Sequence, residues 1–223
     1  MSFSRFFGHD IDFDKAATMF TEHHLLYSLF ALLAIFLTYS FADKIKKSPK
    51  EKTIKISVAI LLIVLELTYH IHNWTYPRVS LPLHLCSFAT VLNIYLLFTD
   101  SKKVFEYAFL FGILGVFMAL VFPNSLGYTY YNFRYYHFIL LHFTIISVPI
   151  YYYKAYDFRI TYKSIYKTMA LIICVLPLVV FVNFTFDKNY MFIGEKPEIM
   201  ASILPDWPYY ILIFVGLTPV AFH

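Results

Sequence analysis

The chain has little charge for its length. Of its 223 residues, 14% are Asp, Glu, Lys or Arg, whereas 60% are hydrophobic and the mean hydropathy is +0.63. In a soluble domain roughly a quarter of the residues are charged, and a chain of this size cannot bury so much apolar surface against itself. The composition therefore excludes an ordinary soluble domain and favours lipid as the solvent.

Cysteines, glycines and long basic arrays are scarce as well. Two cysteines, Cys86 and Cys174, do not make a disulfide framework, so we expect at least one free thiol. The basic residues form short groups without interleaved stacking aromatics, which excludes nucleic acid as a partner. Six glycines and no internal repeat weigh against the broken helix pairs of many secondary transporters.

Long apolar runs predict an all-α membrane protein, a bundle of about seven transmembrane helices. Runs of about 18 residues or more can cross the hydrocarbon core. Six runs reach this length, and a seventh at the C-terminal end is short for a span. We expect one membrane domain over residues 1–223, whose first 20 residues form an amphipathic segment at the interface. The predicted helices cover residues 24–42, 54–72, 81–99, 104–123, 135–153, 166–184 and 207–222.

The basic residues are divided unequally between the two predicted sides. Twelve of the 18 Lys and Arg residues lie in the first, third and fifth connections, and six lie on the other side. Because cytoplasmic loops are enriched in Lys and Arg, we expect these connections in the cytoplasm and the N-terminus outside. The predicted location is the cell membrane, as a multi-pass protein, with the bacterial plasma membrane favoured.

Polar residues gather in the outer half of this predicted bundle. Glu66 and His70 are four residues apart and therefore share a helix face. Ionisable side chains inside a span are costly and normally face a functional path, although a histidine satisfied by headgroups and water is the alternative at each position. The histidines of the outer half are His23, His24, His70, His72, His84, His137 and His142.

Cys86 is the main candidate for a nucleophile. Ser80 and Pro82 are typical of a helix start, which would place Cys86 about one turn into the helix. The positive end of the helix dipole favours a thiolate there. The alternative for Cys86 is a small buried hydrophobic residue, which is also our interpretation of Cys174.

A thiol nucleophile needs a base nearby. His84 is a poor choice, because residues two apart on a helix point to nearly opposite sides. His142 and His137 lie at similar depth on another predicted helix, so either could be the base.

The same region contains four possible zinc ligands. They form two pairs, His70 with His72 and His84 with Cys86, each with one residue between its members. Zinc accepts His and Cys tetrahedrally, but this spacing splits each pair across a helix. A metal site is therefore an alternative, and we predict no metal or other cofactor.

The LPLHLC segment at residues 81–86 resembles the YwaF-like integral membrane family, whose members carry such a segment at the third helix. The stretch FRYYHFILLH at 133–142 is similar to the family's FRFFQFFLSH pattern, with His142 at the family histidine and His137 where Gln is common. Glu66 and His24 also match. The resemblance extends over nearly the whole chain through NYMF at 189–192, KP at 196–197 and WPxY at 207–210.

The resemblance implies a catalytic pair. Animal relatives of this family are similar to acyltransferases that remodel ether phospholipids, and more distant relatives are similar to membrane hydrolases of fatty-acid esters. The acyltransferase branch uses a Cys and a His, which the resemblance places at Cys86 and His142. It therefore prefers His142 to His137 as the base.

The sequence leads to three functional hypotheses. The first is a membrane lipid acyltransferase or lipid-ester hydrolase, in which Cys86 attacks an ester and His142 is the base. The second is a non-enzymatic binding or transport protein that uses the same outer chamber, and the third is a zinc-dependent membrane hydrolase. Membrane lipids are the expected substrate or ligand, and no oligomeric state is predicted. The residues expected to assist catalysis or line the chamber are His84, Glu66, His70, His137, Asn93, Arg134, His24 and Asn189.

Overall fold

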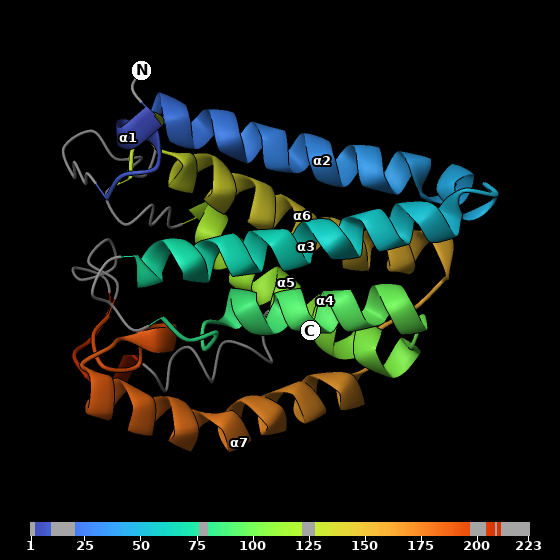
Figure 1. The fold of residues 1–223 in the computed structure, drawn as a ribbon. Coiled ribbons are helices and arrows are strands. Elements are labelled where there is room, and N and C mark those ends of the chain that lie inside the picture. Colours follow the sequence, from blue (N-terminus) through green and yellow to red (C-terminus); the bar gives the residue numbers. More distant parts are fainter. Residues whose placement is uncertain are drawn as a thin grey trace. The chain divides into compact units, whose positions relative to one another are not determined.

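The computed structural model is all-helical and describes residues 3–9, 21–75, 80–121, 128–196, 204–207 and 209–210. Six long helices form most of it (Figure 1), and each coincides with one of the first six predicted runs. A short helix α1 (Phe3–Phe6) precedes them, and a 3₁₀ turn η1 (Tyr190–Phe192) follows. The six are α2 (Glu22–Lys46), α3 (Glu51–Trp74), α4 (Leu85–Thr99), α5 (Lys102–Val121), α6 (Phe133–Ala155) and α7 (Tyr162–Phe186).

Four helices are long and apolar enough to cross a membrane. They are α2, α3, α6 and α7, whereas α4 is a shorter apolar helix of 15 residues. Among the described residues the structure thus supports four such spans, fewer than the seven predicted. Of the predicted seventh helix only Trp207, Tyr209 and Tyr210 are described, and of the predicted interfacial segment only residues 3–9.

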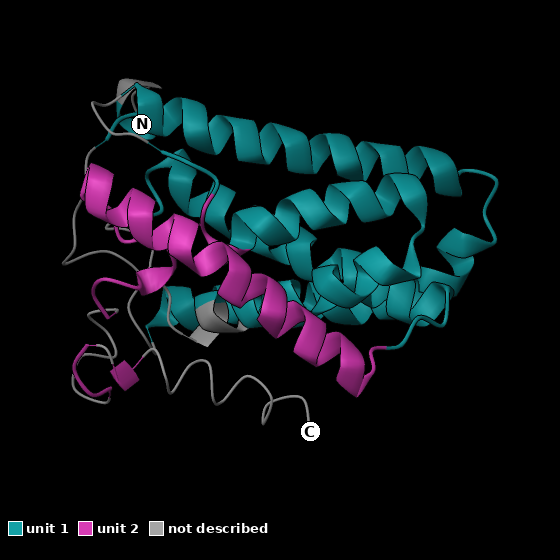
Figure 2. Ribbon diagram, turned by 90° about the horizontal axis from the view of Figure 1, so that it is seen from below, with its two compact units in different colours: residues 1–82, 86–159 teal, residues 83–85, 160–223 magenta. Residues whose placement is uncertain are grey.

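The chain divides into two compact units (Figure 2). Unit 1 comprises residues 1–82 and 86–159, and unit 2 comprises residues 83–85 and 160–223. In unit 1, α6 contacts α2, α3 and α5. In unit 2, the side-chain amide of Asn183 near the end of α7 bonds both the N–H and the C=O of Tyr190, which ties η1 to that helix. The single membrane domain stays a prediction.

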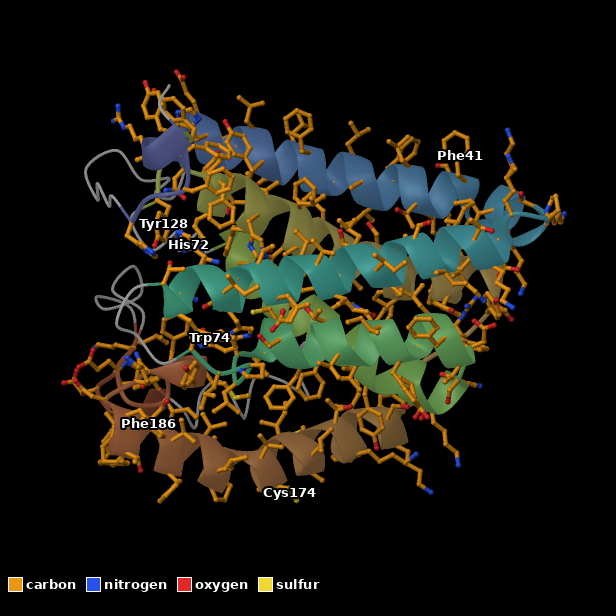
Figure 3. The ribbon with its side chains drawn as sticks, viewed as in Figure 1. Phe41, His72, Trp74, Tyr128, Cys174 and Phe186 are labelled. Atoms are coloured by element: carbon orange, nitrogen blue, oxygen red, sulfur yellow. The ribbon has the colours of Figure 1, made fainter. Side chains whose placement is uncertain are left out.

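Large apolar side chains remain exposed along the long helices. On α2, Leu29 and Phe36 are 64% and 65% exposed, and Phe184 on α7 is 84% exposed. Phe41 projects from α2 in the same way (Figure 3). Exposed apolar surface on this scale is unfavourable in water, whereas helices that satisfy their own backbone can present it to lipid. The exposure therefore agrees with the composition.

A proline inside α6 creates a free carbonyl that a second helix satisfies. Pro149 lacks an N–H, so the Ile145 carbonyl four residues earlier loses its helical partner. The Asn93 side chain, fully buried on α4, donates from Nδ2 to this oxygen at 2.9 Å. Because this position is buried, the Asn93 amide provides the bond that the Ile145 carbonyl lacks, and this bond joins α4 to α6.

Replacing Asn93 tests this arrangement. We expect Asn93→Ala to lower the free energy of unfolding by about 1 kcal/mol, since it leaves the Ile145 oxygen buried without a partner. In a Pro149→Ala background the helix supplies its own N–H, so the same substitution should cost much less. Thermal unfolding of the four proteins in detergent measures the coupling. Equal losses in both backgrounds would contradict this interpretation.

A network of paired charges lies at the end of unit 1 where α3 begins and α4 ends. The Lys55 ammonium donates to both carboxylate oxygens of Asp100 at 2.7 and 2.8 Å and to the Tyr156 hydroxyl at 3.0 Å. The Tyr152 hydroxyl donates to Asp100 at 2.5 Å, and Tyr156 donates to Glu51 at 2.6 Å. Burial raises the pKa of Asp100, but the bonds from Lys55 and Tyr152 outweigh it, so its pKa lies below the usual value.

Asp100 should therefore contribute stability that depends on pH. Asp100→Asn keeps a residue type that tolerates the positive φ of 51° but removes the charge opposite Lys55. We expect a loss of about 1–2 kcal/mol at neutral pH, at the low end because the Asp100 side chain is 40% exposed. Since the folded pKa is depressed, the difference should persist above about pH 4 and fade as the pH drops through the folded pKa.

Asp157→Asn is the matched control for this experiment. Asp157 has a similar φ of 55°, and its side chain is 84% exposed. We expect its substitution to change stability by less than about 0.5 kcal/mol. Thermal unfolding of both variants between neutral and acidic pH makes the comparison, and a pH-independent loss in Asp100→Asn would refute the electrostatic explanation.

Candidate functional site

Polar side chains from three helices meet at one end of unit 1, where α3 ends and α4 and α6 begin. The Asn132 side chain caps α6 by accepting from the Arg134 N–H at 2.9 Å, and its Nδ2 donates to the Gly8 carbonyl at 2.7 Å. The N-terminal segment is thereby held against the start of α6. We call the following group the polar cluster: Glu66, Tyr69, His70, Ser80, Cys86, Ser87, Arg134, His137 and His142.

Glu66 and His70 form the ion-pair geometry that their spacing predicts. Glu66 Oε1 lies 3.2 Å from His70 Nε2, one turn away on α3. The other ring nitrogen, Nδ1, lies 2.9 Å from the hydroxyl of Ser80. His70 is buried, and protein groups bond both of its ring nitrogens. A carboxylate on one side and a hydroxyl on the other hold the ring in one orientation.

The helix that carries Cys86 starts later than predicted. α4 begins at Leu85, so Ser80 and Pro82 precede it and do not form its first turn. Pro82 disfavours a helical conformation in the residue before it. Ser80 is not a cap either, because its hydroxyl receives a bond from the Asn73 amide at 3.2 Å besides its contact with His70. This loop is bonded to the end of α3.

Cys86 is therefore the second residue of α4 and carries a free thiol. It is partly exposed by area, and it lies within electrostatic range of both Glu66 and Arg134. Its carbonyl accepts a bond from the Thr90 hydroxyl at 2.8 Å, which fixes the backbone at this turn. Cys174 is also a free thiol, and it is exposed on α7 in unit 2 (Figure 3).

His142 has a defined tautomer. Its Nδ1 lies 2.7 Å from the carbonyl of Phe138, one turn earlier in α6. A carbonyl only accepts, so Nδ1 carries the proton and the neutral ring keeps its lone pair on Nε2. The ring is buried and lies within electrostatic range of Glu66. No hydrogen bond joins His142 to the Cys86 thiol among the described residues, and Glu66 is the neighbour that both share.

His137 is bonded across to another helix. Its Nε2 donates to the Leu65 carbonyl of α3 at 2.7 Å. Because the Leu65 carbonyl only accepts, Nε2 carries the proton in the neutral ring of His137. His137 therefore links α6 to α3, whereas the bond of His142 stays within its own helix.

Four other predicted residues lie elsewhere. His24 is buried near the start of α2 and packs edge-on against Tyr27. Asn93 bonds the carbonyl freed by the proline of α6, as described above. His84 and Asn189 belong to unit 2: the His84 ring lies 5.0 Å from that of Tyr190, and Asn189 Oδ1 accepts the N–H groups of residues 194 and 195.

A second polar group lies around His72 at this end of unit 1. His72 Nε2 lies 3.3 Å from the Gly8 carbonyl, and the His72 ring lies 4.0 Å from that of His9. Tyr128 is a further neighbour of His72, at 5.9 Å between ring centres (Figure 3). Sequence reasoning did not include Tyr69, Tyr128 and His9 in the site, because aromatic residues are so frequent in this chain that none stands out.

The comparisons with known proteins identify the family. The profile of the TMEM164 family matches residues 19–223. The chain belongs to the TMEM164 family. This is a membrane protein family, in agreement with the apolar helices, and the match spans both units and every residue of the polar cluster. Neither the curated proteins nor the solved structures include a match to this TMEM164 family member. The YwaF-like name that the motifs suggested is not what the family match shows.

The possible zinc ligands do not converge in this TMEM164 family member. His70 faces Glu66 and Ser80, whereas His72 faces Gly8 and His9. This divergence is what residues two apart on a helix should show. In the part of the chain that the structure describes, no three His, Cys, Asp or Glu side chains are arranged to hold a metal ion.

The Ser80 contact of the TMEM164 family chain can be tested directly. We expect Ser80→Ala to lower the free energy of unfolding by about 1–3 kcal/mol, since it leaves a buried nitrogen of His70 without a partner. Thr144→Ala is the control, because the Thr144 hydroxyl bonds only the carbonyl of Leu140 in its own helix and is exposed. It should cost less than about 0.5 kcal/mol. Thermal unfolding in detergent measures both, and equal effects would contradict a specific role for Ser80.

Proposed function

We propose that this TMEM164 family member transfers or hydrolyses the acyl chains of membrane lipids through a Cys86 nucleophile and a His142 base. The observation that carries the proposal is the tautomer of His142. The Phe138 carbonyl binds Nδ1–H, so the ring offers the Nε2 lone pair at a buried position that shares the neighbour Glu66 with Cys86. Acyl transfer requires a thiol and a base with an available lone pair, and the proposal requires Sγ and Nε2 to approach each other when the substrate binds.

The reaction is written in two balanced steps. In the first, His142 Nε2 takes the thiol proton as Sγ attacks the ester carbonyl carbon, and the carbon–oxygen bond then breaks. His142 returns the proton to the departing lipid oxygen, and the acyl group remains on Sγ as a thioester. In the second, water or the hydroxyl of another lipid attacks the thioester while His142 takes its proton. The carbon–sulfur bond breaks, and Sγ recovers the proton.

The remaining polar residues are proposed as supporting groups. Glu66 orients His70 and provides the negative charge that stabilises a protonated His142 during the reaction. Within unit 1, the oxyanion is assigned to Asn93, whose second amide hydrogen is available because only one serves the Ile145 carbonyl. Catalytic hydrogen bonds often tighten only when substrate binds, which is the reason we expect the thiol and the ring to pair in the complex.

We also propose the topology that the basic residues predict. The polar cluster lies on the outer side of the bacterial plasma membrane, and the Lys55–Asp100 network lies on the cytoplasmic side. Seven spans with an external N-terminus complete this proposal. The outer leaflet would then be the source of the lipid substrate.

A binding role is the second candidate, and two observations favour it. No hydrogen bond joins Cys86 to His142 among the described residues, and the buried guanidinium of Arg134 has unpartnered nitrogens. A protein that captures a lipid without turnover needs donors for the lipid but does not need a bond between the thiol and a base. The experiment below separates the two functions, because only acyl transfer forms a thioester.

Mass spectrometry of the purified protein tests the acyl-enzyme. We expect an added acyl mass on Cys86 that hydroxylamine removes, because a thioester is cleaved by this nucleophile whereas an amide is not. His142→Ala should lower the rate of its formation by at least about 100-fold, within the usual contribution of general acid–base catalysis. Cys174 in the same protein is the internal control and should remain unmodified.

Cys86→Ala and Cys174→Ala complete the design. Loss of lipid turnover in the first and full turnover in the second would support a Cys86 nucleophile. Full activity of Cys86→Ala in a lipid-remodelling assay would refute it. Co-purified intact lipid with no turnover in the unmodified protein would instead favour the binding role.

A further inference from the structure

The guanidinium of Arg134 is buried without a matching charge. Arg134 is only 6% exposed, and its Nε and Nη1 atoms are buried with no hydrogen-bond partner. No ion pair joins Arg134 to a carboxylate among the residues that the structure describes. A buried charge is costly unless it is paired and hydrogen-bonded. Nε and Nη1 of this permanently charged group therefore have no acceptor among the described residues.

Two tyrosine rings hold the guanidinium in place. Its central carbon lies 4.2 Å from the ring centre of Tyr69 and 5.6 Å from that of Tyr128. These cation–π contacts orient the flat side of the group, and Tyr69 also takes a side-chain hydrogen bond from it, whereas Nε and Nη1 have no partner. The backbone is fixed as well, since Asn132 caps the Arg134 N–H at the first turn of α6. The side chain is therefore preorganised.

The chemistry of the free donors points to an oxyanion. Nε–H and Nη1–H leave the guanidinium from different edges, so each offers one charge-assisted hydrogen bond to a phosphate or carboxylate oxygen. The start of α6 adds the positive end of a helix dipole to the same place. Arg134 also lies within electrostatic range of the Cys86 thiol.

We propose that Arg134 is the binding site for a phosphate oxyanion, the phosphodiester of a membrane lipid or free phosphate. This inference rests on the proposed function in one respect: a lipid whose ester reaches Cys86 carries its phosphate only a few bonds away. Bound there, the phosphate pairs with the guanidinium, and the ester is positioned at the thiol. Arg134 is then a substrate-binding residue that selects phospholipids over uncharged glycerides.

Binding is measured in a protein that cannot turn over. In the full-length Cys86→Ala protein in detergent, native mass spectrometry compares dioleoyl phosphatidylglycerol, dioleoylglycerol, inorganic phosphate and oleate. We expect phosphatidylglycerol to bind at least about tenfold more tightly than dioleoylglycerol, the effect of one charge-assisted hydrogen bond. Arg134→Gln in the same background should remove that preference and leave dioleoylglycerol binding unchanged.

Two further variants sharpen the result. Arg134→Lys keeps the charge but loses the planar guanidinium with its Nε and Nη1 donors, so it should recover only part of the preference. Arg159→Gln is the matched control, because Arg159 bonds the Tyr153 and Phe158 carbonyls at the opposite end of unit 1. It should bind all four probes as the parent does. If Arg134→Gln does not fold, thermal stabilisation of the Arg134-containing protein by phosphatidylglycerol over dioleoylglycerol gives the same comparison.

The outcomes separate the sources of the anion. Arg134-dependent binding of phosphatidylglycerol assigns the site to a lipid headgroup, and Arg134-dependent binding of inorganic phosphate alone assigns it to the free ion. A preference that survives in Arg134→Gln, or Arg134-dependent binding of oleate alone, overturns the proposal. Because no thioester forms in the Cys86→Ala background, failure of this inference is distinguishable from failure of the acyl-enzyme.

Discussion

The structure depends on one constraint: a polar group that lies away from water must find its partner within the protein. In lipid the constraint is severe, because an unsatisfied backbone group costs several kcal/mol. The carbonyl freed by Pro149 is bonded by Asn93, and the ring of His70 is bonded on both sides. The Asn93 bond joins α4 to α6, and the Ser80 bond joins the loop before α4 to α3. Bonds that satisfy these polar groups therefore also connect different segments of the chain.

The two ends of unit 1 meet this constraint in different ways. At one end Lys55, Asp100 and the tyrosine hydroxyls form a network in which each charge has an opposite charge or several donors beside it. At the other end Glu66 is paired with His70, but Arg134 has no carboxylate partner among the described residues. The proposed phosphate site rests on this unpaired cation, since a buried charge without a partner is costly and a bound anion would pair with it.

Much of the fold could be read from the sequence. The first six apolar runs correspond to α2–α7 because a hydrophobic run of spanning length has only one stable backbone conformation in lipid. The start of α4 was predicted wrongly, since Ser80 resembled a cap but bonds the side chains at the end of α3 instead. Local signals define a cap only when no tertiary partner competes for the same hydroxyl.

The sequence by itself determined that the chain is a helical membrane protein, that Glu66 and His70 share a face, and that Cys86 lies near the start of an apolar helix. Each follows from composition, from the helical period or from the order of the chain. Only the tertiary structure decided which nitrogen of His142 keeps its lone pair, that His137 bonds α3, and that Arg134 lies close to two tyrosine rings. These depend on neighbours distant in the sequence or on a side-chain rotamer, which a linear pattern does not specify.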